Sequence, residues 1–401
     1  MLSRRAVLIG SAVAAGYAAR RARAGVVGVT DAEIKIGNTM PYSGPASSYS
    51  AVGRADAAYF RMINDQGGID GRKINFISYD DAYTPPKTVE QARRLVEQDG
   101  VAFLFNNLGT PTNSAIVKYC NAKKIPQLFV STGADKWGNY KETPWTIGWI
   151  PSYRTESQIY AKYILREKPD AKIGLLYQND DFGKDYLYGV KDVLGDKFDT
   201  MVRTATYEVS DATIDSQIVS LQGSGANILI TAAVPKFAAQ AIRKAHDTGW
   251  KPMHFLTYVS NSVGAVMQPA GPEKAIGTIT AAFLKDVTDS KWMDDPAVKE
   301  WRAFMTKYLP EADTTDTLYV WGYGASHTMT HVLKQCGDDF SRENIMRQAT
   351  SLKDLENPML LPGIKINTSP TNYHPIRQMQ LAQWTGKNWE LFGELIEGAG
   401  A

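Results

Sequence analysis

The sequence predicts an α/β protein with two lobes, each built on a parallel β-sheet that helices cover. From residue 33 onward, short apolar runs alternate with longer helical patterns, which is the arrangement of βαβ units. The alternation forms two consecutive series of similar size, residues 33–150 and 151–275, separated by a Pro-bounded extended stretch at 143–151. A length of 401 residues is enough for two or three domains that each bury a core.

The first series begins and ends with a strand. Its strands are short apolar runs rich in branched and aromatic side chains, expected at 33–37, 74–79, 101–106 and 127–130. Its helices have apolar residues at helical spacing, expected at 50–66, 86–98 and 113–122. Gly67 and Gly68 end the first helix, because glycine adopts the left-handed conformation that commonly follows a helix.

The second series repeats the pattern. Its helices are expected at 155–167, 184–194, 214–222 and 236–248. Its strands are expected at 173–177, 201–207, 228–232 and 254–258. Beyond it, the pattern predicts a strand at 276–283, helices at 296–308, 316–334 and 343–350, and a hairpin of 378–385 with 388–394. This tail is too small for a third domain and is expected to complete the two lobes.

The composition excludes several classes of protein. With 44% hydrophobic and 21% charged residues the chain is neither disordered nor a multi-span membrane protein. A formal net charge of +2 gives no reason to expect nucleic acid as a partner. The two cysteines, Cys120 and Cys336, exclude a disulfide scaffold and a CxxC metal site. We expect two unpaired thiols, since Cys120 falls on a helix where it resembles a small core residue.

Residues 1–24 have the layout of a secretory signal peptide. Arg4 and Arg5 precede an apolar run from Ala6 to Ala19, and residues 22–24 (ARA) offer an A-x-A cleavage site. The run is too short to cross a membrane as a helix, which disfavours a membrane anchor. The arginine pair fits the twin-arginine route and the general secretory route about equally. Both routes predict export to the periplasm of a bacterium.

The loops after the predicted strands are the natural place for a ligand, because open parallel sheets bind ligands beyond the carboxyl ends of their strands. In the first series these loops are 38–44, 107–111 and 131–135, and in the second 179–183, 233–235 and 259–261. Thr110 is a good N-cap and Pro111 suits the first helical position. The free N–H groups of that helical turn attract a carboxylate or another anion.

No enzyme motif is found, so neither catalysis nor a cofactor is expected. The sequence contains no GxSxG, no P-loop and no GxGxxG after a strand. His327 and His331 have a zinc-like spacing, but Thr328 stands where HExxH has its general base, so no metal site is expected. An exported hydrolase on an α/β sheet remains the alternative from a different class of function.

Five segments together resemble a known family. They are residues 34–37 (IKIG), 43–45 (SGP), 64–72 (NDQGGIDGR), 79–81 (YDD) and 179–183 (NDDFG). The mature chain is similar to type I periplasmic binding proteins of the Leu/Ile/Val-binding group, the solute receptors of branched-chain amino acid ABC importers. This resemblance implies a monomer with two Rossmann-like lobes, joined by three crossovers, that close on a ligand by hinge motion.

The three implied crossovers also divide the chain. Lobe I is expected to comprise residues 25–149 and 278–355, and lobe II residues 150–277 and 356–401.

The resemblance also implies roles for individual residues. In the family, a hydroxyl residue and N–H groups hold the ligand carboxylate, and the matching positions are Thr110 and the loop of Ser131, Thr132, Gly133, Ala134 and Asp135. Phe182 matches an aromatic that packs on the ligand. The family's acidic ligand for an ammonium group matches Val259 or a neighbour, and no Asp or Glu occurs from 255 to 272. Further candidates around the cleft are Tyr42, Tyr49, Tyr153, Val234 and Tyr258.

These positions lead to a hypothesis about function. The chain is expected to be a periplasmic receptor that binds a small organic acid, with aromatic acids among the candidates, and delivers it to an ABC permease. The first alternative is an amino acid or amide receptor that uses Asp135 for the amine. The second is a ligand-sensing regulatory protein.

Overall fold

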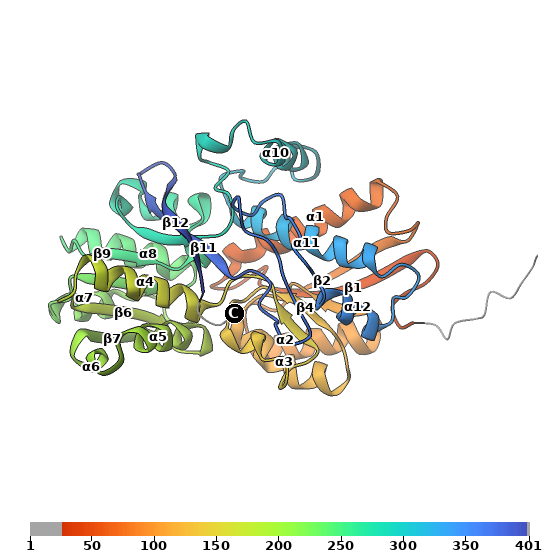
Figure 1. Cartoon of the computed structure of the whole chain (residues 1–401), viewed down its shortest axis with the longest axis horizontal. Coiled ribbons are helices and arrows are strands. Elements are labelled where there is room, and N and C mark those ends of the chain that lie inside the picture. The colour runs from red at the N-terminus through yellow and green to blue at the C-terminus, as the bar shows by residue number, and fades with distance from the viewer. Residues whose placement is uncertain (1–25, 399–401) are drawn as a thin grey trace, which may run out of the picture.

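The structure is a computed structural model that describes residues 26–398. The predicted signal peptide, residues 1–24, lies outside the described residues. Two α/β lobes lie side by side, with the green elements of the second lobe on the left of Figure 1 and the orange elements of the first on the right. Across the described part of the chain, no helix has both the length and the apolar character that a membrane crossing needs.

The first lobe has a five-stranded parallel sheet in the order β2-β1-β3-β4-β5. Its strands are β1 (Glu33–Met40), β2 (Lys73–Asp80), β3 (Phe103–Phe105), β4 (Gln127–Val130) and β5 (Thr146–Gly148). Its first helices are α1 (Ser50–Asp65), α2 (Pro85–Arg93) and α3 (Thr110–Ala122). The short edge strand β5 was not predicted, because it lies in the Pro-bounded stretch that the sequence marks only as extended.

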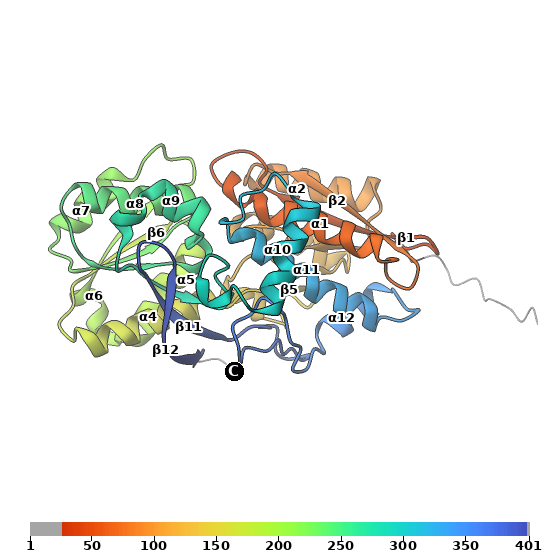
Figure 2. The ribbon, with the colours of Figure 1, turned by 90° about the horizontal axis from the view of Figure 1, so that it is seen from above.

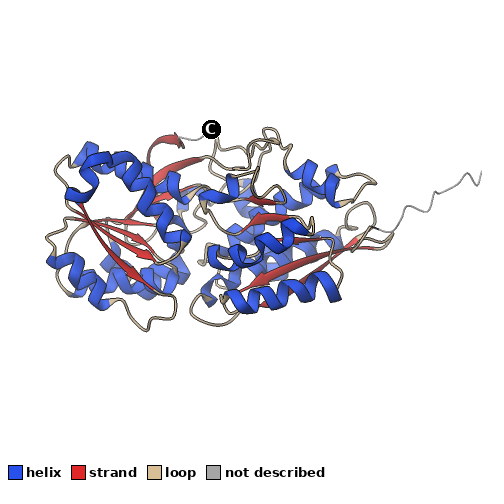
Figure 3. Cartoon of the chain, turned by 90° about the horizontal axis from the view of Figure 1, so that it is seen from below, coloured by secondary structure: helices blue, strands red, loops and turns tan. Residues whose placement is uncertain are grey.

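The second lobe has a seven-stranded sheet in the order β12-β11-β10-β9-β8-β6-β7. Its parallel strands are β6 (Ile173–Gln178), β7 (Val202–Tyr207), β8 (Ile228–Ala232), β9 (Met253–Leu256) and β10 (Ile279–Ala282). The predicted hairpin forms the antiparallel strands β11 (Gln378–Trp384) and β12 (Trp389–Glu397) at one edge. Helices lie on both faces of this sheet (Figure 3). They are α4 (Tyr153–Glu167), α5 (Asp181–Leu194), α6 (Phe198–Met201), α7 (Asp215–Gly223), α8 (Pro235–Asp247) and α9 (Gln268–Ala270).

After β10 the chain returns to the first lobe. It adds α10 (Pro296–Tyr308), α11 (Leu318–Gln335) and α12 (Arg342–Ala349), and α11 packs along α1 (Figure 2). Gly322 allows this close approach, because a Cβ there would lie 2.4 Å from the backbone oxygen of Val52. The chain therefore passes between the lobes three times: after β5, after β10 and before β11.

Two of the expected lobe boundaries differ from the structure. The sequence analysis placed residues 278–355 in lobe I, but β10 pairs with β9 and β11 in the second sheet. It placed residues 356–401 in lobe II, yet the Asn357 side chain donates to the backbone oxygen of Gly324 on α11, at 2.8 Å. Strand pairing decides the first boundary and contacts with α11 decide the second, and both depend on residues far apart in the sequence.

The two cysteines are both buried and free, as the sequence analysis expected. Cys120 lies on α3 and Cys336 directly follows α11. Burial raises the pKa of each thiol to about 12, so both are protonated at neutral pH.

Glu156 on α4 is a fully buried carboxyl at the centre of the second lobe. The hydroxyls of Tyr160 and Tyr186 donate to it, and the backbone N–H of Tyr258 donates to its Oε1 at 2.8 Å. These contacts tie α4 and α5 to the loop that follows β9. Burial raises the pKa of Glu156 to about 8, so the folded protein keeps this proton at neutral pH.

Glu156 should make stability depend on pH. Its folded-state pKa of about 8 lies above the ordinary value of 4.5. The contribution of Glu156 to the free energy of unfolding is therefore complete below pH 4.5 and is lost as the pH rises through 8. Replacing Glu156 with Gln removes the titration. We expect the free energy of unfolding of the wild type to fall, relative to Glu156→Gln, by about 2–4 kcal/mol between roughly pH 5 and pH 8.

Urea denaturation at several pH values measures this difference. Glu167→Gln, at an exposed position on the same helix, is the matched control and should parallel the wild type. Parallel pH profiles for the wild type and Glu156→Gln would contradict a neutral buried carboxyl.

Candidate functional site

A small cavity lies between the lobes at the carboxyl ends of both sheets. The first lobe contributes Tyr49, Tyr83, Leu108, Gly109, Thr110, Ser131 and Trp321. The second contributes Tyr153, Phe182, Val234 and Val259. None of these described lining residues carries a charge at neutral pH. Burial raises the pKa of the Tyr49, Tyr83 and Tyr153 hydroxyls well above 10, so the tyrosines stay neutral as well.

The polar end of the cavity is the first turn of α3. Thr110 begins this helix and its Oγ1 lies 2.6 Å from that of Thr132, in the loop after β4. Gly109, just before it, has φ +101°, and a Cβ there would lie 2.5 Å from the Tyr83 ring. Only glycine fits such a position, which directly precedes the first N–H groups of the helix. This end of the cavity is suited to an anion.

A chain of buried hydrogen bonds fixes the Ser131 hydroxyl. Asp56 on α1 is fully buried and accepts two bonds from Asn106 Nδ2, at 2.8 and 3.1 Å, and one from Ser326 Oγ of α11, at 2.8 Å. Asn106 Oδ1 in turn accepts the hydroxyl of Ser131. The helices α1 and α11 thereby fix the Ser131 hydroxyl, although Ser131 itself lies in the loop after β4.

The second lobe supplies an aromatic and aliphatic wall. The rings of Tyr153 and Phe182 meet edge to face with their centroids 4.8 Å apart. Tyr153 also stacks on Tyr186, at 5.6 Å. The N–H of Val234 donates to the Tyr207 hydroxyl at 3.0 Å, which fixes the end of β8. This wall offers apolar surface and no carboxylate.

The cavity includes most of the predicted ligand-binding residues. Seven line it: Tyr49, Thr110, Ser131, Tyr153, Phe182, Val234 and Val259. Four more are buried directly beside it: Thr132, Gly133, Ala134 and Tyr258. Gly133 has the backbone oxygen of Pro151 and the Tyr153 and Tyr258 side chains around it, and a Cβ would collide with all three.

Tyr42 and Asp135 lie elsewhere, contrary to expectation. The Tyr42 hydroxyl is bonded to Ser78 Oγ at 2.7 Å, against β2. Asp135 accepts the hydroxyl of Ser152 at 2.7 Å and lines a separate small pocket with His374. A loop position alone does not show which way a side chain points, which is why the sequence did not separate these two from the rest.

Four lining residues were not predicted individually. Leu108 and Gly109 belong to the 107–111 loop that the sequence analysis marked, but Tyr83 and Trp321 carried no signal. Trp321 reaches the cavity only because α11 returns to the first lobe after the second crossing. Tyr83 has φ +58°, an unusual conformation for a tyrosine that turns the chain after β2.

The lobes also meet at the rim of the cleft. Lys136 Nζ, after β4, forms an ion pair with Asp181 of α5 at 2.7 Å. The N–H of Asp135 donates to Asp185 of the same helix at 2.8 Å. The Tyr258 hydroxyl donates to the backbone oxygen of Pro151. The ion pair and the Asp135–Asp185 bond join the two lobes directly.

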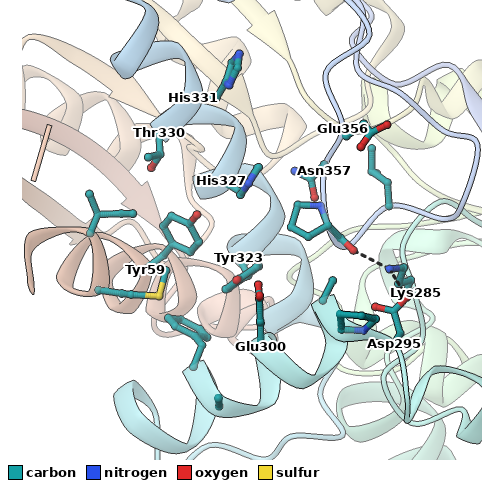
Figure 4. A pocket seen from close by; sticks show the side chains of 18 of the residues that line it. Tyr59, Lys285, Asp295, Glu300, Tyr323, His327, Thr330, His331, Glu356 and Asn357 are labelled. Carbon is teal, nitrogen blue, oxygen red and sulfur yellow. Dashed lines mark hydrogen bonds and ion pairs between the residues drawn. The ribbon is translucent and has the colours of Figure 1, made fainter. Parts of the chain in front are cut away.

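A larger hollow lies on the first lobe, away from the cleft, between α1, α10, α11 and residues 356–365 (Figure 4). His327 and His331 both line it. Burial lowers the pKa of His327 to about 4, so its ring is neutral. Within residues 26–398, His, Cys, Asp and Glu side chains form no group of three or more that could hold a metal ion.

Known proteins share this architecture. The family model described as periplasmic binding protein matches residues 33–388. A Leu/Ile/Val-binding protein homolog 1 of Brucella abortus is 24% identical over 327 residues, 78% of this chain and 81% of that one. A leucine-, isoleucine-, valine-, threonine- and alanine-binding protein of Pseudomonas aeruginosa is 23% identical over 269 residues, covering 65% and 70%.

Solved structures agree with the fold. A branched chain amino acid ABC transporter protein from Thermus thermophilus with bound valine has a TM-score of 0.81 at 15% identity, covering 92% of this chain and 97% of that one. A fatty acid ABC transporter substrate-binding protein from Thermomonospora curvata has a TM-score of 0.79 at 21% identity, covering 93% and 94%. With the family model matching nearly the whole described chain, this protein belongs to the periplasmic binding protein family, whose members are substrate receptors and not enzymes.

Proposed function

We propose that this protein is the periplasmic receptor of an ABC importer and binds a small carboxylate with an apolar or aromatic body. The observation that carries the proposal is the cavity itself, which has anion-binding groups at one end and no charged side chain in its lining. A ligand that leaves its hydration shell needs a partner for every charge that it carries. The cavity offers such partners to a carboxylate only.

The carboxylate is assigned to the first lobe. Thr110 and Ser131 supply hydroxyls, and the first turn of α3 supplies N–H groups and the positive end of a helix dipole. The hydrogen bonds to Thr132 and Asn106 hold both hydroxyls in place before a ligand arrives. Such preorganisation reduces the entropy that binding loses.

The apolar part of the ligand is assigned to the second lobe, where an ammonium group finds no partner. Val259 lies where the Leu/Ile/Val-binding group is expected to have a carboxylate. The buried carboxyl of Asp180 is near, but it accepts Gln178 Nε2 at 2.6 Å and the N–H of Gly183 at 3.3 Å. Asp135, the candidate of the amino acid alternative, is bonded to Ser152 outside the cavity. These positions favour an acid over an amino acid.

Two matched pairs of ligands test the proposal. We expect 4-methylpentanoate to bind more tightly than leucine, and 3-phenylpropanoate more tightly than phenylalanine, by about 100-fold or more. The amino acid would bury an unpaired ammonium, which costs several kcal/mol. Isothermal titration calorimetry measures all four affinities. Tighter binding of either amino acid than of its matching acid would contradict the proposal.

The Ser131 hydroxyl should contribute directly to affinity. In the structure the Ser131 hydroxyl donates its single proton to Asn106 Oδ1, so it must turn that proton to the ligand when a carboxylate binds. Ser131→Ala removes this donor, and because the bond to Asn106 is exchanged for the new one, we expect a loss of about tenfold in affinity for the acid that binds best. Ser220→Ala, at an exposed position on α7, is the control and should bind as the wild type does. Equal affinities of the wild type and Ser131→Ala would place the carboxylate elsewhere.

The rim ion pair should add a small, salt-dependent part of the affinity. Lys136 and Asp181 keep 36% and 55% of their side-chain surface exposed, so Lys136→Met should weaken binding only about two- to fivefold. Low ionic strength should enlarge the difference and high salt should abolish it. Lys118→Met, on the exposed side of α3, is the control. A salt-independent loss would indicate that Lys136 acts through packing instead.

A further inference from the structure

A second cavity lies next to the first, on the other side of Trp321. It has more room than the cleft cavity, and Trp321 lines both cavities. The second crossing of the chain, the start of α11 and β12 surround it. Its lining consists of Tyr258, Asn261, Ala282, Phe283, Leu284, Lys285, Asp286, Thr317, Leu318, Trp321 and Trp389. We call it the rear chamber.

A continuous row of aromatic rings leads from the cleft cavity into the rear chamber. Phe182 and Tyr153 line the cleft, with ring centroids 4.8 Å apart, and Tyr153 lies 5.8 Å from Tyr258. Tyr258 in turn meets Phe283 of the rear chamber edge to face, at 5.2 Å. These rings pack against one another, so the wall between the cleft cavity and the rear chamber is aromatic throughout.

The rear chamber offers no free charge among its described lining residues. Lys285 Nζ is 2.9 Å from an Asp295 carboxylate oxygen and 2.9 Å from the backbone oxygen of Pro358. Asp286 accepts the N–H of Trp389 at 3.0 Å and the hydroxyl of Thr288 at 2.7 Å. With both charges already satisfied, the chamber suits the uncharged body of a ligand and not a second charged group.

Trp321 carries an unsatisfied donor at the boundary between the cavities. The side chain is only 4% exposed, and its Nε1–H is buried with no hydrogen-bond partner in the described chain. An indole N–H can only donate, so its natural partner is an oxygen. A buried donor without a partner is uncommon in a folded protein and is explained when a ligand supplies the acceptor.

We propose that Trp321 divides one extended ligand site, and that the ligand is an arylalkanoic acid whose ring passes the indole and enters the rear chamber. This inference rests on the proposed function: the carboxylate stays at Thr110 and Ser131, and a spacer of a few carbons carries the ring past Trp321. The indole N–H donates to a carboxylate oxygen of the ligand, since Trp321 lines the same cavity as Thr110 and Ser131. Trp321 thereby sets the length of acid that the receptor accepts.

A series of acids with increasing spacer length tests this assignment. The probes are benzoate, phenylacetate, 3-phenylpropanoate and 4-phenylbutanoate, titrated by calorimetry into the wild type, Trp321→Phe and Trp321→Ala. We expect the wild type to bind 3-phenylpropanoate at least tenfold more tightly than benzoate. Trp321→Phe should lose about tenfold for every acid, because it keeps a ring but not the N–H. Trp321→Ala should shift the preference to 4-phenylbutanoate.

Ala282→Leu fills part of the rear chamber from β10 and serves as a second variant. It should lower the ratio of the affinity for 4-phenylbutanoate to that for benzoate by at least tenfold. A melting curve confirms that each variant is folded. Affinities that do not depend on spacer length, or a ratio that Ala282→Leu leaves unchanged, would overturn the rear chamber while the proposed function stands. Binding of 4-methylpentanoate but of none of these aromatic acids would overturn the rear chamber alone, and binding of none of the acids, 4-methylpentanoate included, would overturn the proposed function as well.

Discussion

Two fully buried carboxyl groups hold the loops that face the cleft. They belong to Asp56 in the first lobe and Glu156 in the second. Burying a carboxyl is costly unless donors surround it, and here the donors come from different elements. Asn106 and Ser326 reach Asp56 from the end of β3 and from α11, while Tyr186 and the backbone of Tyr258 reach Glu156 from α5 and the loop after β9. Because each carboxyl draws its donors from several elements, each one ties the loops that face the cleft to the helices behind them.

This arrangement gives the two lobes different tasks in one binding site. The first lobe presents hydroxyls and helix N–H groups that are already oriented, and the second presents rings and aliphatic side chains. Three passages of the chain join the lobes, and the groups that line the cavity are held by hydrogen bonds within their own lobe. The proposed selectivity for an acid over an amino acid rests on two features. The described lining has no carboxylate for an ammonium group, and it supplies hydroxyl and N–H donors for a carboxylate.

The sequence predicted the order of nearly all strands and helices, because the periodicity of apolar residues is a local property. It also predicted most of the residues that line the cleft cavity, since the carboxyl ends of parallel strands identify the relevant loops, such as those of Thr110 and Phe182. It did not identify Trp321 or the membership of β10, which depend on where distant segments return. Nor did it determine that Asp135 turns away from the cleft, because side-chain direction in a loop depends on packing with the other lobe.

The two buried, unpaired thiols have a consequence for how the protein is made. Cys120 and Cys336 are buried and protonated in the folded chain. Neither presents a thiolate that an oxidant could modify or that could attack a disulfide. The chain consequently reaches its final state without any oxidation step and has the same covalent structure in a reducing or an oxidising compartment. Assembly of the two lobes is therefore independent of disulfide-forming enzymes, whichever side of the inner membrane it takes place on.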